Sequence, residues 1–476
     1  MKTKEKNMYG MDYLEKDDYS EYKYKILVYP NITYQKDLEK DSYVIVLTNI
    51  IKELNKIRND IHWTIISPAH IHSLDFYNTE QILVPMPSYP NAMRTHFDFK
   101  RIIKLINWKK MDFDIVYSHL PEHTLQLKNL IYNNTNINPL FIGYTHWTEF
   151  PEITNYEMTM MDVNILGLLE MEGCGINTQA QKELILKNAK KNFNKNVIER
   201  LDNIIVPQYL GWEIPKYEKQ KTDKKIIVFN HRPHKYKSYD WFIKQMDRLW
   251  EQRQDFEVWN ESRFYDSFID DYDEWKKENE FEVWVPLTDN LNRAYLINNK
   301  YDRFGYFSKL SSCRVGVCAK QKYAGWAVSA TDGMSVGVPY MFSDDDYYRE
   351  LAGGSGIYYS NEDDFNNKIN KILDDDEYRE DWSKRSLERF EMGKWENMIV
   401  KFNNILNKTI DMLPAIKEDT DSYNKIVKFI KTKKSVSKKD ILEHLGWGVR
   451  ISFTGYRNKL RKDSIIKFTK NRYEVI

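Results

Sequence analysis

Short apolar runs alternate with helical patterns along the first half of this 476-residue chain. The runs read as buried strands, and a segment with apolar residues at helical spacing follows several of them. Strands that alternate with helices predict right-handed βαβ units and a parallel sheet. We expect strands at 24–29, 61–66, 82–84, 114–118, 140–144, 163–167 and 204–206, and helices at 42–56, 99–108 and 179–191.

The same pattern restarts after residues 207–223, which contain Pro207, Gly211 and Pro215 and read as a linker. Two successive Rossmann-like halves predict two α/β domains that face a cleft, with ligands beyond the carboxyl ends of the strands. The second half has predicted strands at 225–229, 315–318, 339–342 and 356–359 and helices at 239–252, 362–374 and 395–413. We therefore divide the chain into a loose arm (1–22), a first domain (23–210), a second domain (222–413) and a tail (421–476).

The tail is strongly basic, with fifteen Lys and Arg against five Asp and Glu, whereas the whole chain has a net charge of only +1. A basic unit of this kind indicates a polyanionic partner. Helical patterns at 423–431, 437–446 and 452–462 precede a predicted hairpin of 465–468 with 473–476. This order resembles a winged-helix DNA-binding domain, and the alternative is a solvated tail packed on the body. The residues expected to contact DNA are Arg450, Arg457, Asn458, Arg461 and Lys470.

Residues 323–342 predict a binding site for a phosphate and a sugar. Gly325 opens a helix that is expected to run to about Val336, Gly337 ends it, and a buried strand follows. A glycine turn before a helix collects free backbone N–H groups at the positive end of the helix dipole, which favours a phosphate. Asp332 lies farther along the helix, where its carboxylate can accept hydrogen bonds from a sugar hydroxyl.

This stretch resembles the donor-binding signature of retaining GT-B glycosyltransferases. The resemblance implies that Asp332 holds the ribose of a nucleotide-sugar and that Trp326 lies in the donor loop. Two positions depart from the signature: Ala324 replaces its first acid, which contacts the donor sugar, and Asp332 is shorter than the usual Glu. The alternative is an ordinary helix-to-strand corner. The matching residues are Gly325, Trp326, Asp332, Met334, Gly337 and Pro339.

Two loops that follow predicted strands carry further candidates. Arg232 and Lys237 occupy the places where the resembling family puts cations on the donor diphosphate. Fixed cations there stabilise the negative charge that builds on the leaving group. In the first domain, His146 lies where the family places a histidine beside the donor sugar, and Glu149 follows as an acid/base or acceptor contact. The alternatives are a solvated basic loop, a core histidine and a surface carboxylate.

Three acidic clusters, at 270–271, 344–346 and 374–376, invite a metal interpretation. We interpret them as helix caps and solvated faces, because the resembling family works without a metal. No cofactor is expected besides the donor substrate. The three cysteines are too few for a disulfide framework, and we find no signal peptide or apolar run long enough to span a membrane. We therefore expect a soluble cytoplasmic protein.

Taken together, the patterns predict a metal-independent glycosyltransferase similar in kind to phage enzymes that glucosylate hydroxymethylated bases in DNA. Its donor would be a nucleotide-sugar, with UDP as the expected nucleotide. Its acceptor would be the hydroxyl of a 5-hydroxymethylpyrimidine flipped out of duplex DNA. Two alternatives remain: a transferase for a surface glycan or lipid, whose basic tail binds an anionic membrane, and a non-catalytic DNA-binding protein on a degenerate transferase scaffold.

Overall fold

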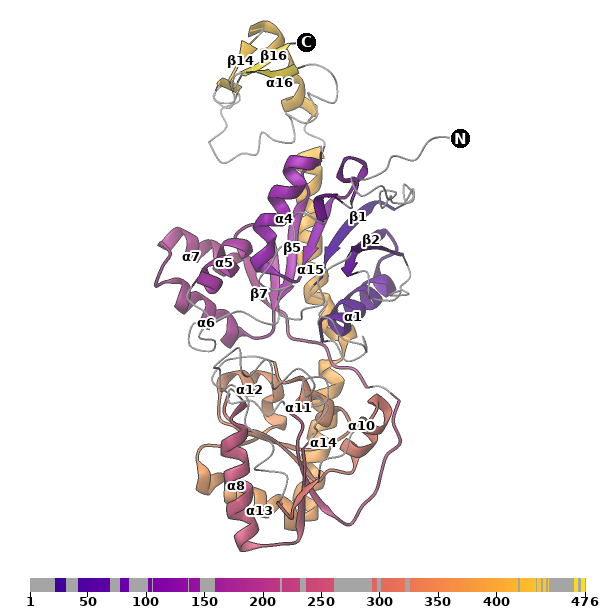
Figure 1. Ribbon diagram of the computed structural model, residues 1–476, viewed down its shortest axis with the longest axis vertical. Coiled ribbons are helices and arrows are strands. Elements are labelled where there is room, and N and C mark those ends of the chain that lie inside the picture. The colour runs from indigo at the N-terminus through magenta and orange to yellow at the C-terminus, as the bar shows by residue number, and fades with distance from the viewer. Residues whose placement is uncertain are drawn as a thin grey trace.

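The fold of the chain is known from a computed structural model, shown in Figure 1. The structure describes residues 22–30, 42–68, 78–84, 102–104, 106–135, 137–145, 159–214, 216–231, 237–260, 293–297, 301–321, 326–417, 420–433, 435–437, 440–441, 444, 466–469 and 472–475.

The first domain is built on a seven-stranded parallel sheet with the strand order β3-β2-β1-β4-β5-β6-β7. The chain starts in the middle of the sheet, builds one side, and then crosses to the other side between β3 and β4, as in a Rossmann fold. Its strands are β1 (Tyr24–Tyr29), β2 (Ile61–Pro68), β3 (Thr79–Val84), β4 (Ile115–Ser118), β5 (Leu140–Thr145), β6 (Gly173–Ile176) and β7 (Ile205–Pro207).

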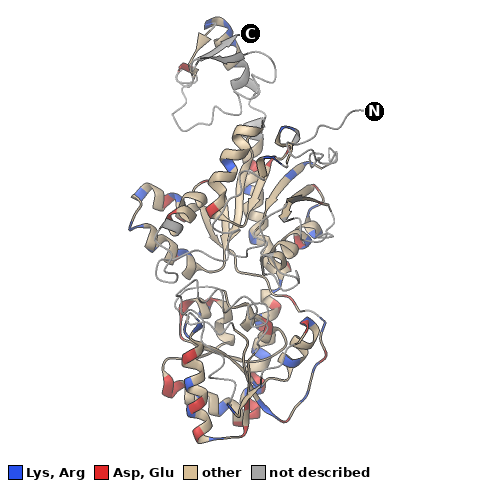
Figure 2. Ribbon diagram, in the orientation of Figure 1, with Lys and Arg blue, Asp and Glu red and all other residues tan. Residues whose placement is uncertain are grey.

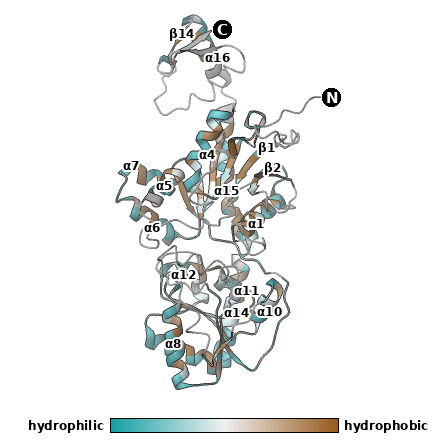
Figure 3. Ribbon diagram, viewed as in Figure 1, coloured by the Kyte–Doolittle hydropathy of each residue, from teal (hydrophilic) through white to brown (hydrophobic). Residues whose placement is uncertain are grey.

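Helices cover both faces of this sheet, because its strands are apolar on both sides. Ile26 and Val28 of β1 pack with α1 (Ser42–Ile57), whereas Leu27 and Tyr29 belong to the core on the opposite face. That second core includes residues of α4 (Pro121–Asn134), α5 (Thr159–Leu168), α6 (Gln179–Ala189) and α7 (Lys195–Ile204). Figure 3 shows the strands as mostly hydrophobic and the outer helices as mixed. Continuous apolar runs are typical of such doubly covered parallel sheets.

One predicted strand is wrong: residues 163–167 lie inside α5. Met161, Ile165 and Leu168 are fully buried at a spacing of four and three residues, which is the spacing of a helix face. Gly167 allows α5 to approach α4, since a Cβ there would lie 1.7 Å from the backbone oxygen of Pro121. A short apolar run does not by itself distinguish a strand from a buried helix.

The second domain repeats the architecture with a six-stranded parallel sheet of order β10-β9-β8-β11-β12-β13. The predicted strand at 225–229 and the helices at 239–252 and 362–374 are confirmed as β8, α8 and α13. The strands are β8 (Lys225–Phe229), β9 (Phe256–Asn260), β10 (Leu296–Ile297), β11 (Val315–Cys318), β12 (Tyr340–Ser343) and β13 (Ile357–Tyr359). The helices are α8 (Tyr239–Gln252), α10 (Arg303–Ser311), α11 (Val328–Ser335), α12 (Asp346–Ala352), α13 (Glu362–Asp374) and α14 (Asp376–Gly393).

Helix α15 (Trp395–Lys417) follows the second domain in sequence but packs on the first. Phe402 meets the ring of Tyr117 edge-on at 5.4 Å, and Ile405 lies against Gly173 of β6. Residues 395–413 were assigned to the second domain from sequence, so the structure corrects that boundary. α15 thus returns to the first domain, and α16 (Thr420–Lys433) is the next helix in the sequence.

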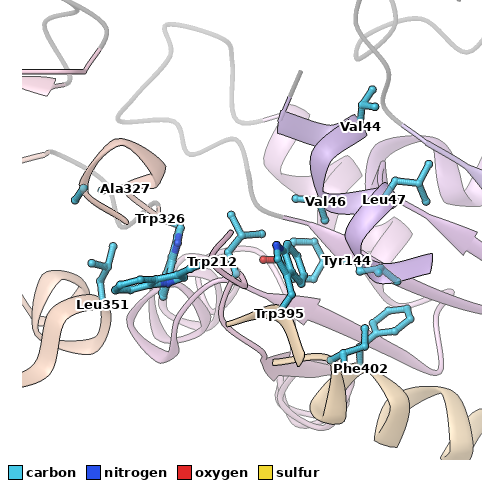
Figure 4. Close-up of a cluster of buried hydrophobic side chains, with 14 of the residues drawn as sticks. Val44, Val46, Leu47, Tyr144, Trp212, Trp326, Ala327, Leu351, Trp395 and Phe402 are labelled. Carbon is cyan, nitrogen blue, oxygen red and sulfur yellow. The ribbon is translucent and has the colours of Figure 1, made fainter. Parts of the chain in front are cut away.

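The chain thus passes between the domains twice, first in the linker (207–223) and again at the junction of α14 with α15 (393–395). These two segments, called the crossings below, contact each other. The amide of Trp212 donates to the carbonyl of Gly393 at 2.9 Å. A Cβ on Gly211 would lie 2.2 Å from the Trp395 ring, and one on Gly393 would lie 3.0 Å from the Trp212 ring. Figure 4 shows Trp212 and Trp395 in the buried cluster. Each tryptophan therefore packs against a glycine of the other crossing.

In the tail, Ile426 and Ile430 of α16 are buried, as are Val436 and Ile441. Its sheet has the order β14-β16-β15, from β14 (Ser435–Val436), β15 (Ile466–Thr469) and β16 (Arg472–Val475). The predicted hairpin is confirmed by the antiparallel pairing of β15 with β16. Ser437 and Asp440 cap each other, with the Ser437 amide 2.7 Å from the Asp440 carboxylate. The predicted third helix, with Arg450, Arg457, Asn458 and Arg461, lies outside the described residues, as does Lys470.

Among the described residues, no helix is both long enough and apolar enough to cross a bilayer.

Gly316 of β11 provides a test of packing in the second domain. A Cβ at this position would lie 2.3 Å from the ring of Tyr340, which is fully buried. Gly316→Ala should therefore lower the free energy of unfolding by about 1–3 kcal/mol, because the buried Tyr340 ring has no space into which it could shift. Urea unfolding followed by circular dichroism would measure the change. Gly354→Ala is the control, since a Cβ there meets nothing within 4 Å; equal stability losses in the two variants would contradict the packing argument.

Candidate functional site

The candidate site lies where the second sheet reverses its strand order, between β8 and β11. In open α/β sheets, ligands bind beyond the carboxyl ends of the strands at this point. Asn230 and His231 follow β8 there, Gln321 follows β11, and α11 begins with Val328 after the predicted donor loop. The predicted Arg232, Gly325 and the position Ala324 lie outside the described residues, whereas Lys237, Trp326 and Asp332 lie within them.

Asn230 is the hub of a buried hydrogen-bond network at this edge. Its amide nitrogen donates to the Tyr306 hydroxyl at 2.9 Å and to the carbonyl of Ser329 at 2.7 Å. Its amide oxygen accepts from the Tyr340 hydroxyl at 2.9 Å. Burial raises the pKa of Tyr340 well above its ordinary value, so this hydroxyl remains a donor. Sequence reasoning missed Asn230, Tyr306 and Tyr340; only Asn230 gave a signal, as a polar residue between a buried strand and a basic loop.

Tyr306 connects this hydrogen-bond network to Asp332. Its hydroxyl donates to the Asp332 carboxylate at 3.2 Å, which connects α10 to α11. Tyr306 is 4% exposed, whereas Asp332 is half-buried. The carboxylate is thus oriented from the protein side and still reaches the surface. This arrangement suits an acid that accepts hydrogen bonds from a diol such as a ribose.

Lys237 lies on the same edge, just before α8. Its ammonium group donates to the Gln321 amide oxygen at 2.8 Å, and the Gln321 amide nitrogen donates to the Tyr348 hydroxyl at 2.7 Å. The next residue, Ser238, has a left-handed backbone with φ of 52°, and its hydroxyl donates to the Lys320 carbonyl. The loop before α8 is therefore tied to the loop after β11. A cation held in this way is preorganised rather than free to move.

The predicted helix after the glycine turn is confirmed as α11, and Gly337 follows its end with φ of 84°. Ala327 occupies the N-cap position and provides no side-chain cap, and the first turn of α11 contains no acid. Trp326 is 8% exposed, and its ring lies 5.9 Å from that of Tyr209 in the linker. Figure 4 shows Trp326 close to Leu351 and Trp212. Trp326 thus connects the candidate site to the crossing between the domains.

In the first domain, two histidines near the carboxyl end of β4 are buried and have tyrosine partners. His119 lies 2.6 Å from the Tyr117 hydroxyl, and His123 lies 3.2 Å from the Tyr29 hydroxyl. Their rings are 1% and 2% exposed, respectively. These contacts are typical of core histidines. The preferred candidates, His146 and Glu149, lie outside the described residues.

A carboxylate of the second domain binds the start of a helix in the first domain. Glu350 of α12 accepts from the amides of Gln179 and Ala180, both at 2.7 Å, in the first turn of α6. Arg389 holds the same segment of α12 by donating to the carbonyls of Glu350 and Leu351. Because a carboxylate is favoured at a helix N-terminus, Glu350 holds α6 and α12 together.

The described acidic clusters have structural partners. Arg349 pairs with Asp344 and lowers the pKa of that carboxyl. Asp375 caps α14 by accepting from the Tyr378 amide, and Asp374 pairs with Lys225 and Arg253. Acidic residues are frequent on this domain (Figure 2). Among the described residues, no group of three His, Cys, Asp or Glu side chains is placed to hold a metal ion.

A pocket of about 380 Å³ lies at the crossing between the domains, away from the candidate site. Asn49 of α1 lies in its wall and donates to the Glu213 carboxylate at 3.0 Å. The described residues lining this pocket come from α1, the linker and the junction of α14 with α15, and include Trp212, Phe390, Lys394 and Trp395.

Glu350→Gln should weaken the contact between the domains. The neutral amide loses the interaction with the positive end of the α6 dipole, while its size is preserved. We expect a larger radius of gyration in small-angle X-ray scattering and an unchanged melting temperature of each domain. Glu362→Gln, which changes an acid within the second domain only, is the control. Scattering curves of Glu350→Gln that superimpose on those of the wild type would contradict this role.

Comparison with known proteins gives the site a family context. Residues 212–389 match the family model of Glycosyl transferases group 1. No curated protein sequence matches the chain. Solved structures share its fold at low identity, so they support the architecture alone.

Three of these structures illustrate the match. Sucrose-phosphate synthase from Thermosynechococcus elongatus is 11% identical with a TM-score of 0.61, covering 82% of this chain and 99% of its own. Anabaena HepE in complex with UDP and glucose is 11% identical with a TM-score of 0.57, covering 81% and 100%. Trehalose 6-phosphate synthase from Burkholderia multivorans is 10% identical with a TM-score of 0.58, covering 83% and 99%. The chain thus has the GT-B fold, and the family match over residues 212–389 confirms the prediction of a glycosyltransferase enzyme.

Proposed function

We propose that this enzyme transfers a sugar from a UDP-sugar to the hydroxyl of a 5-hydroxymethylpyrimidine in duplex DNA. The binding of the donor is supported by the hydrogen-bond network from Asn230 through Tyr306 to Asp332, which lies where the second sheet reverses its strand order. HepE, which shares the fold, has been solved with UDP and glucose and with UDP-glucose. The acceptor half is supported by the charge and the strand order of the tail.

On the donor side, each residue has a defined role in the proposal. Asp332 accepts hydrogen bonds from the ribose hydroxyls, and Tyr306 fixes the orientation of its carboxylate. Arg232 and Lys237 neutralise the diphosphate, and the turn of Gly325 and Trp326 brings backbone amides to it. When the glycosidic bond breaks, the electron pair leaves with the diphosphate, and the two cations stabilise the negative charge that develops. The proposed reaction therefore needs no cofactor besides the donor.

The acceptor hydroxyl attacks the anomeric carbon of the donor sugar and loses its proton. His146 and Glu149, which follow β5 in the sequence, are the proposed residues beside the sugar and the acceptor. The resemblance to the retaining branch favours attack on the face from which the diphosphate departs, with the departing phosphate oxygen taking the proton. Ala324 removes the family's acidic contact to the donor sugar. Other residues must therefore recognise the donor sugar.

The tail supports DNA as the acceptor. Its sheet order β14-β16-β15, in which the strand after the first helix pairs with the last strand, is typical of winged-helix domains. Its excess of Lys and Arg favours phosphates, and Arg450, Arg457, Asn458, Arg461 and Lys470 are the proposed DNA contacts. The helix that precedes the tail in sequence, α15, packs on the first domain, which binds the acceptor in this proposal.

Asp332→Ala should reduce use of the donor at least ten- to hundredfold, because a charge-assisted hydrogen bond in a dry site contributes roughly 1.5–3 kcal/mol. Tyr306→Phe should have a smaller effect in the same direction, since it leaves the carboxylate in place but unfixed. Titration calorimetry with UDP and kcat/KM for the UDP-sugar would measure both. Asp381→Asn, which changes an exposed acid of α14, is the control. Wild-type affinity for UDP in Asp332→Ala would remove the assignment of the donor site.

Arg457→Glu with Arg461→Glu should raise the KM for long hydroxymethylated duplex much more than it lowers turnover on a free hydroxymethyl nucleoside. Wild-type binding to duplex should weaken steeply with salt, because each neutralised phosphate releases counterions. Nucleoside mass spectrometry after incubation with a panel of nucleotide-sugars would detect the product. Lys219→Glu with Lys221→Glu makes the same charge change in the exposed linker and serves as the control. An enzyme that ignores hydroxymethylated DNA and binds anionic vesicles would indicate a surface glycan or lipid acceptor instead.

A further inference from the structure

Tyr209 lies in the linker between the domains, and its backbone conformation is unusual. It follows Gln208, whose amide donates to the Ile176 carbonyl at 2.8 Å and fixes the start of the linker on β6. Tyr209 has a left-handed backbone with φ of 61°. Bulky residues rarely adopt this conformation, which persists only where the surrounding contacts hold it. The contacts of the Tyr209 side chain therefore indicate what this part of the linker does.

The half-buried ring of Tyr209 contacts elements of both domains. Its centroid lies 5.9 Å from that of Trp326, in the predicted donor loop, and the ring planes are tilted by 31°. The ammonium group of Lys401 lies 4.5 Å from the Tyr209 centroid, and it also donates to the Pro207 carbonyl at 3.3 Å. Lys401 belongs to α15, which packs on the first domain. One ring thus connects the donor loop to a helix of the other domain.

The Tyr209 hydroxyl makes a third contact, with Glu350 of α12. Burial raises the pKa of Tyr209, and the hydrogen-bonded carboxylate of Glu350 raises it further, so the hydroxyl keeps its proton and donates to Glu350. The same carboxylate accepts from the amides of Gln179 and Ala180 in the first domain. The ring is therefore fixed from its hydroxyl end by a side chain that is itself bound to the first domain.

Trp326 is held by packing. Its side chain is 8% exposed, and its indole nitrogen is buried without a hydrogen-bond partner in the part of the chain that the structure describes. Aromatic rings at about this separation attract each other beyond the effect of their buried area. Trp326 directly precedes Ala327, the N-cap of α11. A displacement of the Trp326 ring would therefore move the start of α11, where the donor diphosphate is expected.

We propose that Tyr209 is a positioning residue for the donor: its ring holds Trp326, and with it the start of α11, in the arrangement that receives the diphosphate. This inference rests on the proposed function, since it concerns the same donor site. Tyr209 is not a donor contact in this proposal and acts through Trp326. Because Tyr209 also contacts Glu350 and Lys401, the support of the donor loop includes residues from both sides of the linker.

The test compares UDP with uridine, which lacks the diphosphate. Tyr209→Asn removes the ring and keeps the backbone, because asparagine adopts the left-handed conformation readily. In titration calorimetry its Kd for UDP should rise about three- to tenfold, the effect of losing one aromatic pair, and its Kd for uridine should stay unchanged. Tyr209→Phe, which keeps the ring, should bind UDP nearly as well as the wild type. Tyr217→Asn removes another half-buried tyrosine of the linker and is the control.

A double variant tests whether Tyr209 acts through Trp326. Trp326→Leu should weaken the binding of UDP, and adding Tyr209→Asn should weaken it little further, because the contact between the two rings is already lost. Full additivity of the two losses would contradict the inference. Equal weakening of UDP and uridine in Tyr209→Asn, or no weakening of either, would contradict it as well.

Hydrogen exchange without a ligand separates this inference from the proposed function. The amides of Ala330 and Thr331 donate to the Ala327 carbonyl in the first turn of α11. They should exchange faster in Tyr209→Asn than in the wild type, and at the wild-type rate in Tyr209→Phe. Unchanged exchange in Tyr209→Asn would show that the ring does not hold the start of α11. If exchange follows the prediction but the wild type binds no UDP, the proposed function is wrong and the contact only supports the fold.

Discussion

The side chain of Asn230 connects four elements of the second domain: β8, α10, α11 and β12. Its hydrogen-bond partners are the buried hydroxyls of Tyr306 and Tyr340 and the backbone carbonyl of Ser329, so leaving any of them without a hydrogen bond would be costly. The arrangement of the candidate site follows from this constraint. The hydrogen bond from Asn230 holds Tyr306 where its hydroxyl contacts Asp332. A second hydrogen bond from Asn230 holds Ser329 at the end of β8. A parallel sheet brings strand ends together at one edge, but this amide determines which helices meet there.

The two domains are joined by contacts of different kinds. At the crossing, Trp212 and Trp395 pack against glycines, and the two segments share a backbone hydrogen bond. Nearer the sheet edges, the contact between Glu350 and α6 is electrostatic and is made by one side chain. Close packing resists separation, whereas a single carboxylate exchanges readily with water. A rotation that opens the domains is therefore expected to pivot at the tryptophans and to release Glu350.

The sequence predicted the two parallel sheets well, because buried strands between helices leave continuous apolar runs. It predicted Lys237, Trp326 and Asp332 as site candidates through spacing and a family resemblance. It did not identify Asn230 as a hub or Tyr306 as a partner of Asp332. These contacts join residues 76 and 26 positions apart, respectively, and no local pattern encodes such pairs. The strand predicted at 163–167 failed because a fully buried helix and a buried strand can share one short apolar run.

The helix that precedes the basic tail, α15, packs on the first domain. A helix of 23 residues extends about 35 Å, and this one packs along the first domain after leaving the second. The start of the basic unit is therefore tied to the domain proposed to bind the acceptor, while the donor residues belong to the other domain. If the domains rotate about the tryptophan crossing, α15 moves with the acceptor domain. DNA held by the tail would then keep its place relative to that domain while the donor domain opens to exchange UDP for a new donor.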